Sequence, residues 1–507
     1  MKSHVANWRS WELNPIVIKE LRQAVRSRAV TGMLLLLLLV LFLTTVTFLV
    51  TRSFDTVGDI ELGGAVFQVF VGILAVASVW FIPLYLGVRV AFERGENNPD
   101  LFYISTLTPG QIIRGKFLCG AYMAVLFFSA CMPFMAFTNL LRGVDLPTVF
   151  FILLFLFLVV CAVNQLAIFF ACLPMSRPFK ILLGLYGFIQ SFWIVVPVIF
   201  GSITMMRSGV GAMLATRQFW GSVSTVGGIG LAAVGLFYVL SVALISPPSS
   251  NRALTPRIYI TVIWFLGAVL SLLWIWKTRN AELILPWASL TFGLMILSLL
   301  VTISNCDQLS VRVQNSIPKK LPQRLLAFLF FNGAAGGLLW VALISAATIL
   351  VVHEVLSRFT TPPTGSTETQ FLIFYAASTA YAFAYALSGL LIQRKFFPKR
   401  APKIAALIAM IFAAVWALAP AVVLFFLDKL SIKTAASLEL GNVFNVLPLR
   451  DDGRCIYHLY FAFGWLAFMM VLSARWFWRQ VKNFRPCQKI EAPPVLAEMT
   501  TPPAVSE

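Results

Sequence analysis

Twelve apolar runs of about twenty residues or more alternate with short polar segments along this chain. A helix needs about 20 apolar residues to cross ~30 Å of hydrocarbon, and a helix satisfies its own backbone hydrogen bonds there. Hydrophobic residues make up 59% of the chain, charged residues 12%, and the mean hydropathy is +0.87. We therefore expect an all-α polytopic integral membrane protein with about 12 transmembrane helices. The runs lie near 31–50, 64–90, 117–140, 147–173, 179–206, 221–246, 258–276, 283–303, 325–352, 370–392, 404–428 and 456–474.

The distribution of Lys and Arg predicts the orientation of these spans. With the N-terminus inside, 28 of the 39 Lys and Arg lie in or beside cytoplasmic segments, and Lys277 and Arg279 are the chief local exceptions. Cytoplasmic loops of membrane proteins carry such an excess, so both termini are predicted to be cytoplasmic. The net charge of +19 then reflects orientation and contact with anionic lipid, and no nucleic-acid partner is expected. The predicted location is the plasma (inner) membrane, multi-pass.

The lengths of the connections divide the chain into four parts. Residues 1–30 precede the first span, 31–257 form a six-span unit with a cytoplasmic loop at 91–116, 258–478 form a second six-span unit with a loop at 304–324, and 479–507 are predicted to be a disordered tail. Because the two loops hold equivalent positions, the second unit is interpreted as a degenerate repeat. Two interpretations of 304–324 stay open: the loop of a second permease lobe, or a basic connector that contacts anionic lipid.

The N-terminal segment is predicted to form a helix on the membrane surface. Asn14 is a good N-cap, and Pro15 suits the first helical position. Ile18, Leu21 and Val25 share one face, which is typical of a helix that lies in the interface. The alternative is that the cations only orient the first span. The polar and aromatic residues of this interfacial helix are Trp8, Trp11, Lys19, Arg22, Arg26 and Arg28.

The loop at 91–116 is composed of segments with defined ends. Residues 97–99 break a helix, and Thr108 followed by Pro109 starts another. Residues 110–116 have the spacing of a phosphate-binding loop, but Phe117 stands where Ser or Thr must bind magnesium, and a membrane span follows. We therefore do not expect this chain to bind ATP.

With these residues in view, the chain resembles the membrane subunits of ATP-binding-cassette (ABC) transporters, specifically type 2 permeases. The resemblance rests on NPIVIKELRQAVRSR before the first span, on Glu93, Arg94 and Gly95 leading to TLTPGQIIRGK, and on PPSSNRALTPR after span six, so it covers about residues 14–260. It implies that residues 1–30 contain an elbow helix and that the first unit is permease-like. It also implies a coupling helix within 91–116 that docks on a separate ATPase subunit. The partner-coupling residues carried over are Glu93, Asp100, Leu101, Phe102, Thr108, Pro109 and Lys116.

The span interiors offer amides but essentially no ionisable side chains. Gln68, Asn164, Gln165 and Gln190 are the deepest polar residues, and such amides are expected to bond across helices. A proton-coupled transporter would need carboxylates at depth, so energy is expected to come from a partner.

Catalytic and metal-binding patterns are not found in the sequence. The three histidines lie far apart. The seven cysteines show no spacing typical of metal ligands and are interpreted as small hydrophobic residues. We expect no metal, no cofactor and no enzymatic activity in this chain.

These observations together predict the permease subunit of an ATP-driven ABC exporter, which forms the translocation pathway. Its expected partners are a cytoplasmic ABC ATPase, the lipid bilayer, and a second permease or a second copy of the chain. Two alternatives stay open: a secondary transporter or channel, and a membrane scaffold that moves nothing. The substrate cannot be read from apolar span faces.

Overall fold

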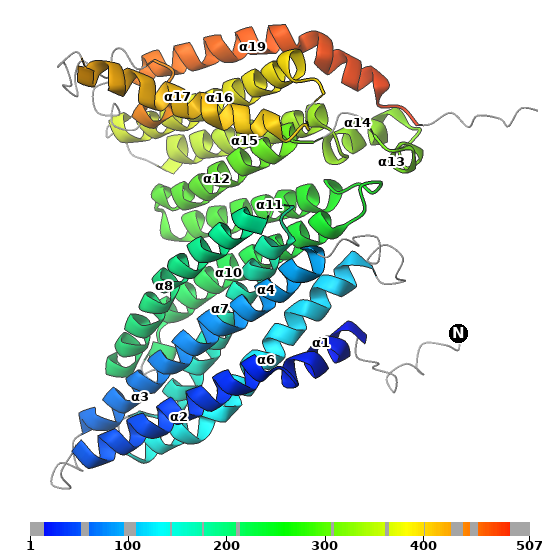
Figure 1. Cartoon of the computed structure of the whole chain (residues 1–507). Helices are drawn as coiled ribbons and strands as arrows, with labels where there is room; N and C mark the ends of the chain where they lie inside the picture. The colour runs from blue at the N-terminus through cyan, green and yellow to red at the C-terminus, as the bar shows by residue number, and fades with distance from the viewer. Residues whose placement is uncertain are drawn as a thin grey trace, which may run out of the picture. The chain divides into compact units, whose positions relative to one another are not determined.

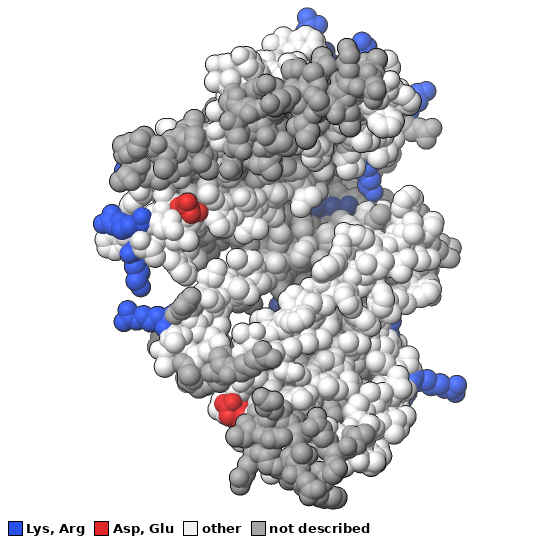
Figure 2. Space-filling view, turned by 90° about the vertical axis from the view of Figure 1, so that its left-hand side faces the viewer, with Lys and Arg blue, Asp and Glu red and all other residues white. Residues whose placement is uncertain are grey.

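Every regular element in the described part of the chain is a helix (Figure 1). The computed structural model describes residues 15–51, 60–95, 108–141, 144–174, 177–208, 213–305, 309–359, 365–399, 401–426, 440–446 and 455–486. Eleven helical stretches among them are long and apolar enough to cross a membrane. The face seen in Figure 2 is mostly uncharged where it is described, with Lys and Arg mainly at its edges and little Asp or Glu. The chain is thus an all-α polytopic membrane protein, as its apolar runs predict.

The chain forms two compact units, 1–247 and 248–507. Helix α10 ends at Ile245, and Pro247 and Pro248 follow directly; proline cannot continue a helix. The predicted boundary at 257/258 lies further along. Residues 249–257 belong to the second unit because their backbone and side chains bond to Ser310 and to residues 329–333.

The first unit consists of helices α1 to α10. Their bounds are α1 (Pro15–Val25), α2 (Arg28–Thr51), α3 (Ile60–Val76), the π-helix η2 (Ala77–Phe81), α4 (Ile82–Gly95), α6 (Pro109–Leu140), α7 (Leu146–Cys172), α8 (Arg177–Ser208) and α10 (Arg217–Ile245). A core of buried aliphatic and aromatic side chains from α2, α3, α4, α6 and α7 holds it together.

The second unit consists of helices α11 to α19. Their bounds are α11 (Leu254–Thr278), the 3-10 helix η3 (Ala281–Leu283), α12 (Ile284–Ile303), α13 (Val311–Asn315), α14 (Leu321–Phe330), α15 (Ala334–Phe359), α16 (Gly365–Phe396), α17 (Ile404–Phe426), the 3-10 helix η4 (Val443–Asn445) and α19 (Cys455–Asn483). Helix α16 packs along both α17 and α19.

The run at 404–428 forms α17, an apolar helix of 23 residues, as predicted. Another predicted span differs from the helices observed. The run at 325–352 is broken: α14 ends at Phe330 and α15 starts at Ala334. Gly333 has a φ of 143°, a conformation that side chains disfavour, so an apolar stretch that looks continuous turns here.

Helix α1 starts at Pro15, as predicted. The side of α1 that packs against the protein differs from the apolar side that the sequence predicts to face the membrane. Val17, Glu20 and Ala24 are buried, whereas Ile18 and Val25 are 43% and 66% exposed. Residues three or four apart share a helix face, so the buried stripe is the one that packs on α6. The exposed apolar residues, together with exposed Lys19, Arg22 and Arg26, keep the character of an interfacial helix.

If consecutive spans alternate in direction, every second helix end must lie on the same side of the membrane. Such helix ends lie together within each unit. In the first unit the buried side chains of Val90, Ile113, Ile168, Cys172 and Ile245 form one cluster. These residues come from the end of α4, the start of α6 and the ends of α7 and α10. The helices therefore run alternately up and down, as consecutive membrane spans must.

Candidate functional site

Four charged side chains meet where α1, α4 and α6 converge in the first unit. Lys116 on α6 places Nζ 3.0 Å from Glu20 Oε1 on α1 and 2.5 Å from Glu93 Oε2 on α4. Arg89, one turn before Glu93, places Nη2 3.6 Å from Glu20 Oε2. The group, called the ion cluster below, balances two carboxylates against two cations. It links three helices that are separate in the sequence.

Local sequence positions each member of the ion cluster. Thr108 caps α6: its hydroxyl accepts from the backbone N–H of Gln111, and the Gln111 side chain accepts from the Thr108 backbone N–H at 2.8 Å. This capping box fixes the first turn of α6. Lys116, two turns further along, lies on the side of α6 that faces α4 and α1. On α4, Tyr85, Arg89 and Glu93 follow one another at steps of four along one face.

Burial makes the ion cluster energetically sensitive. The side chains of Lys116 and Glu20 are each 5% exposed, whereas Glu93 is 28% exposed. Removing one member of a buried pair leaves an uncompensated charge and costs about 3–5 kcal/mol. The arrangement is therefore stable only while α1, α4 and α6 stay in contact.

Arg89 extends the ion cluster toward solvent. Its Nη1 donates to the Tyr85 hydroxyl at 2.9 Å, its Nη2 donates to the side-chain oxygen of Gln23, and its guanidinium lies 5.6 Å from the Tyr85 ring centroid. Both α1 and α4 are thus held by a residue that also contacts the buried carboxylate of Glu20.

The start of α6 is also anchored to α10. The Tyr238 hydroxyl donates to the Gly110 carbonyl at 3.3 Å. A Cβ added at Gly110 would lie 3.3 Å from the Tyr238 hydroxyl oxygen. Residues 110–116 are helical throughout, so the segment with phosphate-loop spacing does not form a phosphate-binding loop.

A second polar layer lies one turn further into α6. Asn164 on α7 is fully buried and faces Gly120, where an added Cβ would lie 3.1 Å from Nδ2. Neither amide atom of Asn164 has a hydrogen-bond partner among the described residues. The adjacent Gln165 donates to the Ser241 hydroxyl on α10 at 3.5 Å. Of the amides predicted to bond across helices, Gln165 does so within the described residues.

The other two predicted amides behave differently. Gln190 is exposed and donates to the Tyr186 hydroxyl at 2.7 Å on its own helix, so its contact with another helix stays a prediction. A turn of α8 brings Tyr186 within reach, so the amide needs no other helix. Gln68 is half-buried on α3.

The structure brings together Glu93 and Lys116 of the predicted partner-coupling residues, with Thr108 and Pro109 framing the start of α6. Asp100, Leu101 and Phe102 lie outside the described residues, as do Trp8 and Trp11.

Sequence reasoning missed three charged residues that the structure buries or pairs: Glu20, Arg89 and Arg257. Three such cations lie near helix ends: Arg89 is close to the end of α4, Lys116 is close to the start of α6, and Arg257 is close to the start of α11. The candidate spans include them, but the prediction that the span interiors contain essentially no ionisable groups stays a prediction. A signal existed for Glu20, since Val17, Glu20 and Ala24 follow helical spacing on the side away from the cations.

Arg257 forms a separate polar junction in the second unit. It is 4% exposed, and its Nη1 donates to the carbonyls of Leu329 and Phe331 at 2.8 and 2.7 Å. Its Nη2 donates to the Gly333 carbonyl at 3.3 Å. The positive charge therefore lies against the C-terminal end of α14, where carbonyl dipoles stabilise cations.

Asn332 completes this junction. Its side chain accepts from the Ala253 N–H and donates to the Ser250 carbonyl, at 2.8 and 3.0 Å, and its backbone N–H donates to the Asn251 side chain at 3.0 Å. The turn between α14 and α15 is thus bonded to the segment that precedes α11.

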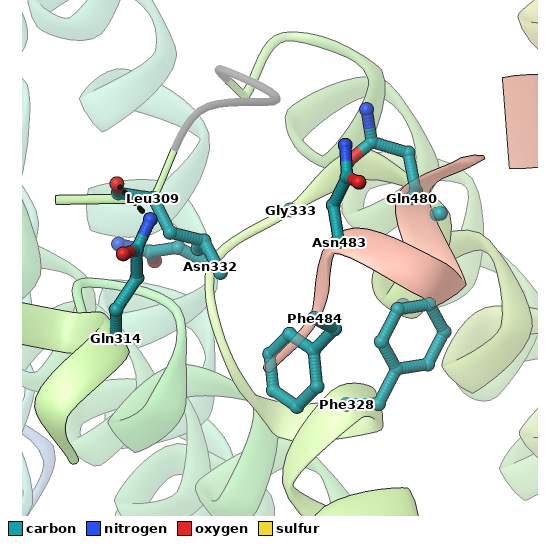
Figure 3. Close-up of a pocket in the computed structure, with 10 residues that line it drawn as sticks. Leu309, Gln314, Phe328, Asn332, Gly333, Gln480, Asn483 and Phe484 are labelled. Atoms are coloured by element: carbon teal, nitrogen blue, oxygen red, sulfur yellow. Dashed lines mark hydrogen bonds between the residues drawn. The ribbon is translucent and has the colours of Figure 1, made fainter. Parts of the chain in front are cut away.

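A cavity of about 660 Å³ lies beside the same turn (Figure 3). Gln314 and Leu309 lie on one side of it and Gln480 and Asn483 on the other, with the rings of Phe328 and Phe484 next to each other. The lining side chains are amides, aromatics and small apolar residues. The cavity therefore has no acid or base for proton transfer among the residues that line it.

Among the described residues, no group of three or more His, Cys, Asp or Glu is placed to bind a metal ion. Comparisons of the chain with protein-family models, with curated proteins and with solved structures found no match.

Proposed function

We propose that this chain is the membrane-spanning subunit of an ATP-driven ABC exporter in the plasma membrane. In this proposal a separate cytoplasmic ATPase subunit supplies the energy and the helices of the chain form the translocation pathway. The proposal begins from the family resemblance of residues 14–260 and adds a physical route by which a partner could move the spans.

The observation that carries the proposal is the ion cluster. Residues 96–107 connect α4 to α6, and Glu93 and Lys116 pair across this connection at 2.5 Å. Lys116 also pairs with Glu20 on α1. A force applied to the connection would therefore displace α1, α4 and α6 together, because separating any two of them exposes a buried charge. Such a rigid group is what a rocking transition between inward-facing and outward-facing states requires.

The absence of a visible energy source in the described residues supports a partner-driven mechanism. Secondary transporters rely on ionisable groups near the bilayer centre that bind the coupling ion. In the first unit the buried ions are neutralised by one another near the start of α6, and Asn164 and Gln165, which lie deeper, are uncharged.

The experiment is co-purification of the chain with a co-expressed ABC ATPase subunit, followed by ATP hydrolysis in lipid nanodiscs. We expect Asp100→Lys to abolish co-purification, because this residue lies in the predicted docking loop. Lys277→Glu is the control: this residue lies in the last turn of α11, at the end predicted to be outside the cell, and the change should leave co-purification unchanged. Failure of the wild-type chain to retain any ATPase would overturn the proposal.

A second variant tests the mechanical role of the ion cluster. The Lys116 side chain is 5% exposed and pairs with Glu20 and Glu93, so it is not available for direct contact with a partner. Lys116→Met should therefore keep the ATPase bound but remove the ATP-dependent movement of α1 relative to α10, measured by the distance between two spin labels. Substrate movement by the chain without any ATPase would instead identify a secondary transporter or channel, and an ATPase complex without such movement in the wild type would favour a scaffold.

A further inference from the structure

Helix α14 presents an apolar surface that no membrane span accounts for. Leu321, Leu325 and Leu326 are 61%, 59% and 62% exposed. Ten residues of helix extend about 15 Å, half of a ~30 Å hydrocarbon layer. The following helix, α15, has 26 residues and is long enough to cross alone. The leucines therefore need an apolar environment beside the span rather than within one.

The inner side of α14 is fixed against the second unit. Ala327 is buried with Ile317 and Phe484, and the Phe328 ring centroid lies 5.3 Å from that of Phe484 at the end of α19. At Gly336, an added Cβ would lie 1.9 Å from the Phe328 carbonyl oxygen, so α15 crosses α14 in direct backbone contact.

These contacts place α14 at one end of the spans. Arg257, near the start of α11, bonds to the last carbonyls of α14. Phe484 directly follows the last residue of α19. Since α11, α15 and α19 are all candidate spans, the ends that contact α14 define the level of the membrane surface, on the side that the sequence predicts to be cytoplasmic.

The charged residues are of one sign in the described segments 309–353 and 455–486, which contain α14 and Phe484 and no Asp or Glu. Lys319 and Lys320 immediately precede α14 and are exposed, as are Lys482 and Arg485 beside Phe484. The Lys482 ammonium lies 5.7 Å from the Trp478 ring centroid, and Trp is typical of the membrane interface.

We propose that α14 with these four cations forms a binding surface for anionic phospholipid. Leu321, Leu325 and Leu326 enter the boundary between headgroups and acyl chains, and the cations contact lipid phosphates. An exposed apolar helix face with adjacent Lys and Arg has the two properties that anionic membrane surfaces select. A water-soluble ATPase would leave the leucines unmatched, so the segment at 304–324 is better explained as a lipid contact than as a second coupling loop.

The first test measures lipid affinity on the purified full-length chain without an ATPase subunit, so its outcome is independent of the proposed transport function. The chain is titrated with phosphatidylglycerol and with phosphatidylcholine, and bound lipid is counted by native mass spectrometry. Replacing Lys319 and Lys320 with Gln should weaken phosphatidylglycerol binding about fivefold per cation. The matched control replaces Lys277 and Arg279, at the other end of α11, with Gln and should bind as the wild type does.

The second test measures depth. Leu325→Cys and Gln323→Cys lie two positions apart and so on nearly opposite sides of α14. Each is made in a chain whose native cysteines are Ser, given a spin label and reconstituted into vesicles containing phosphatidylglycerol. We expect oxygen dissolved in the bilayer to increase the relaxation rate of the label at 325, and a water-soluble nickel complex to increase that of the label at 323.

Equal exposure of both labels to water, or unchanged phosphatidylglycerol affinity in the double Gln variant, would overturn the proposal. If the variant with Lys319 and Lys320 replaced by Gln binds phosphatidylglycerol as the wild type does but no longer retains an ATPase subunit, the surface binds a protein partner instead.

Discussion

Lys116 Nζ lies 3.0 Å from Glu20 Oε1, although the two residues are 96 positions apart in the sequence and both side chains are 5% exposed. This pair joins the interfacial helix α1 to the start of α6. Because α1 runs on into α2, and α6 follows the loop after α4 (Figure 1), the pair fixes how the first membrane helices are arranged relative to one another.

We predict that Lys116→Met and Glu20→Gln each lower the free energy of unfolding of the first unit by up to about 3–5 kcal/mol, because each leaves the buried ion cluster with one unbalanced charge. Glu93 and Arg89 stay as partners of Lys116 and Glu20 and reduce this loss. The double variant should lose much less than the sum of the two single losses, since the remaining charges of Glu93 and Arg89 then balance each other. Thermal unfolding in detergent measures all three.

The control is the exposed pair on α15. Arg358 Nη2 lies 3.0 Å from Glu354 Oε2, but these side chains are 74% and 58% exposed. Glu354→Gln should change stability by less than about 1 kcal/mol, since solvent screens the interaction. Equal effects at the two pairs would show that Lys116 and Glu20 are hydrated rather than buried.

Asn164 leads to a prediction of the opposite sign. Its buried amide has no partner among the described residues, and leucine has the same number and branching of side-chain heavy atoms. Asn164→Leu should therefore raise the free energy of unfolding, by about 1–3 kcal/mol, because an unsatisfied polar group is removed.

Gln165→Met is the matched control for Asn164→Leu. It removes the bond to Ser241, so stability should fall by about 1 kcal/mol or less. If Asn164→Leu also destabilises the chain in the same melting assay, the Asn164 amide holds a bound group that its burial conceals.

Hydropathy predicted the membrane helices because each apolar run is long enough to cross a bilayer by itself. Local chemistry predicted the starts of α1 and α6, where Pro15 and the pair Thr108 and Pro109 favour helix initiation whatever the tertiary structure. These features depend on neighbouring residues, so the sequence alone contains them.

Features that depend on helix rotation or on distant contacts could not be predicted in the same way. In the sequence, Glu20 is one of several charged residues of a polar helix, and only its contact with Lys116 on α6 shows that it is a buried partner. The break before α15 lies inside an apolar stretch, and its turn is stabilised by bonds from Arg257 to residues 329–333 and from Asn332 to residues 250–253, which are distant in the sequence. A single sequence gives the faces of each helix but not which face meets which neighbour.

Arg257 should control the order of the turn between α14 and α15. Arg257→Met removes a charged donor from the carbonyls of Leu329, Phe331 and Gly333, at a cost of about 1.5–3 kcal/mol. Hydrogen exchange by mass spectrometry should show faster exchange in residues 328–336. Arg312→Met, at an exposed cation on α13, should leave this exchange unchanged, and equal protection in both variants would mean that the turn is held by Asn332 alone.

Gly336 tests whether α14 is held directly against α15. A Cβ at this position would lie 1.9 Å from the Phe328 carbonyl oxygen and 3.0 Å from its carbon, which are backbone atoms that cannot rotate away. Gly336→Ala should therefore separate the two helices and lower the free energy of unfolding by about 1–3 kcal/mol, the usual cost of overpacking. Gly293 on α12 has no atom within 4 Å of an added Cβ, so Gly293→Ala should stabilise the chain slightly, because alanine favours helix more than glycine does. A melting temperature that rises in both variants would show that α14 moves freely over α15, and the leucine face of α14 would then have no fixed orientation toward the membrane.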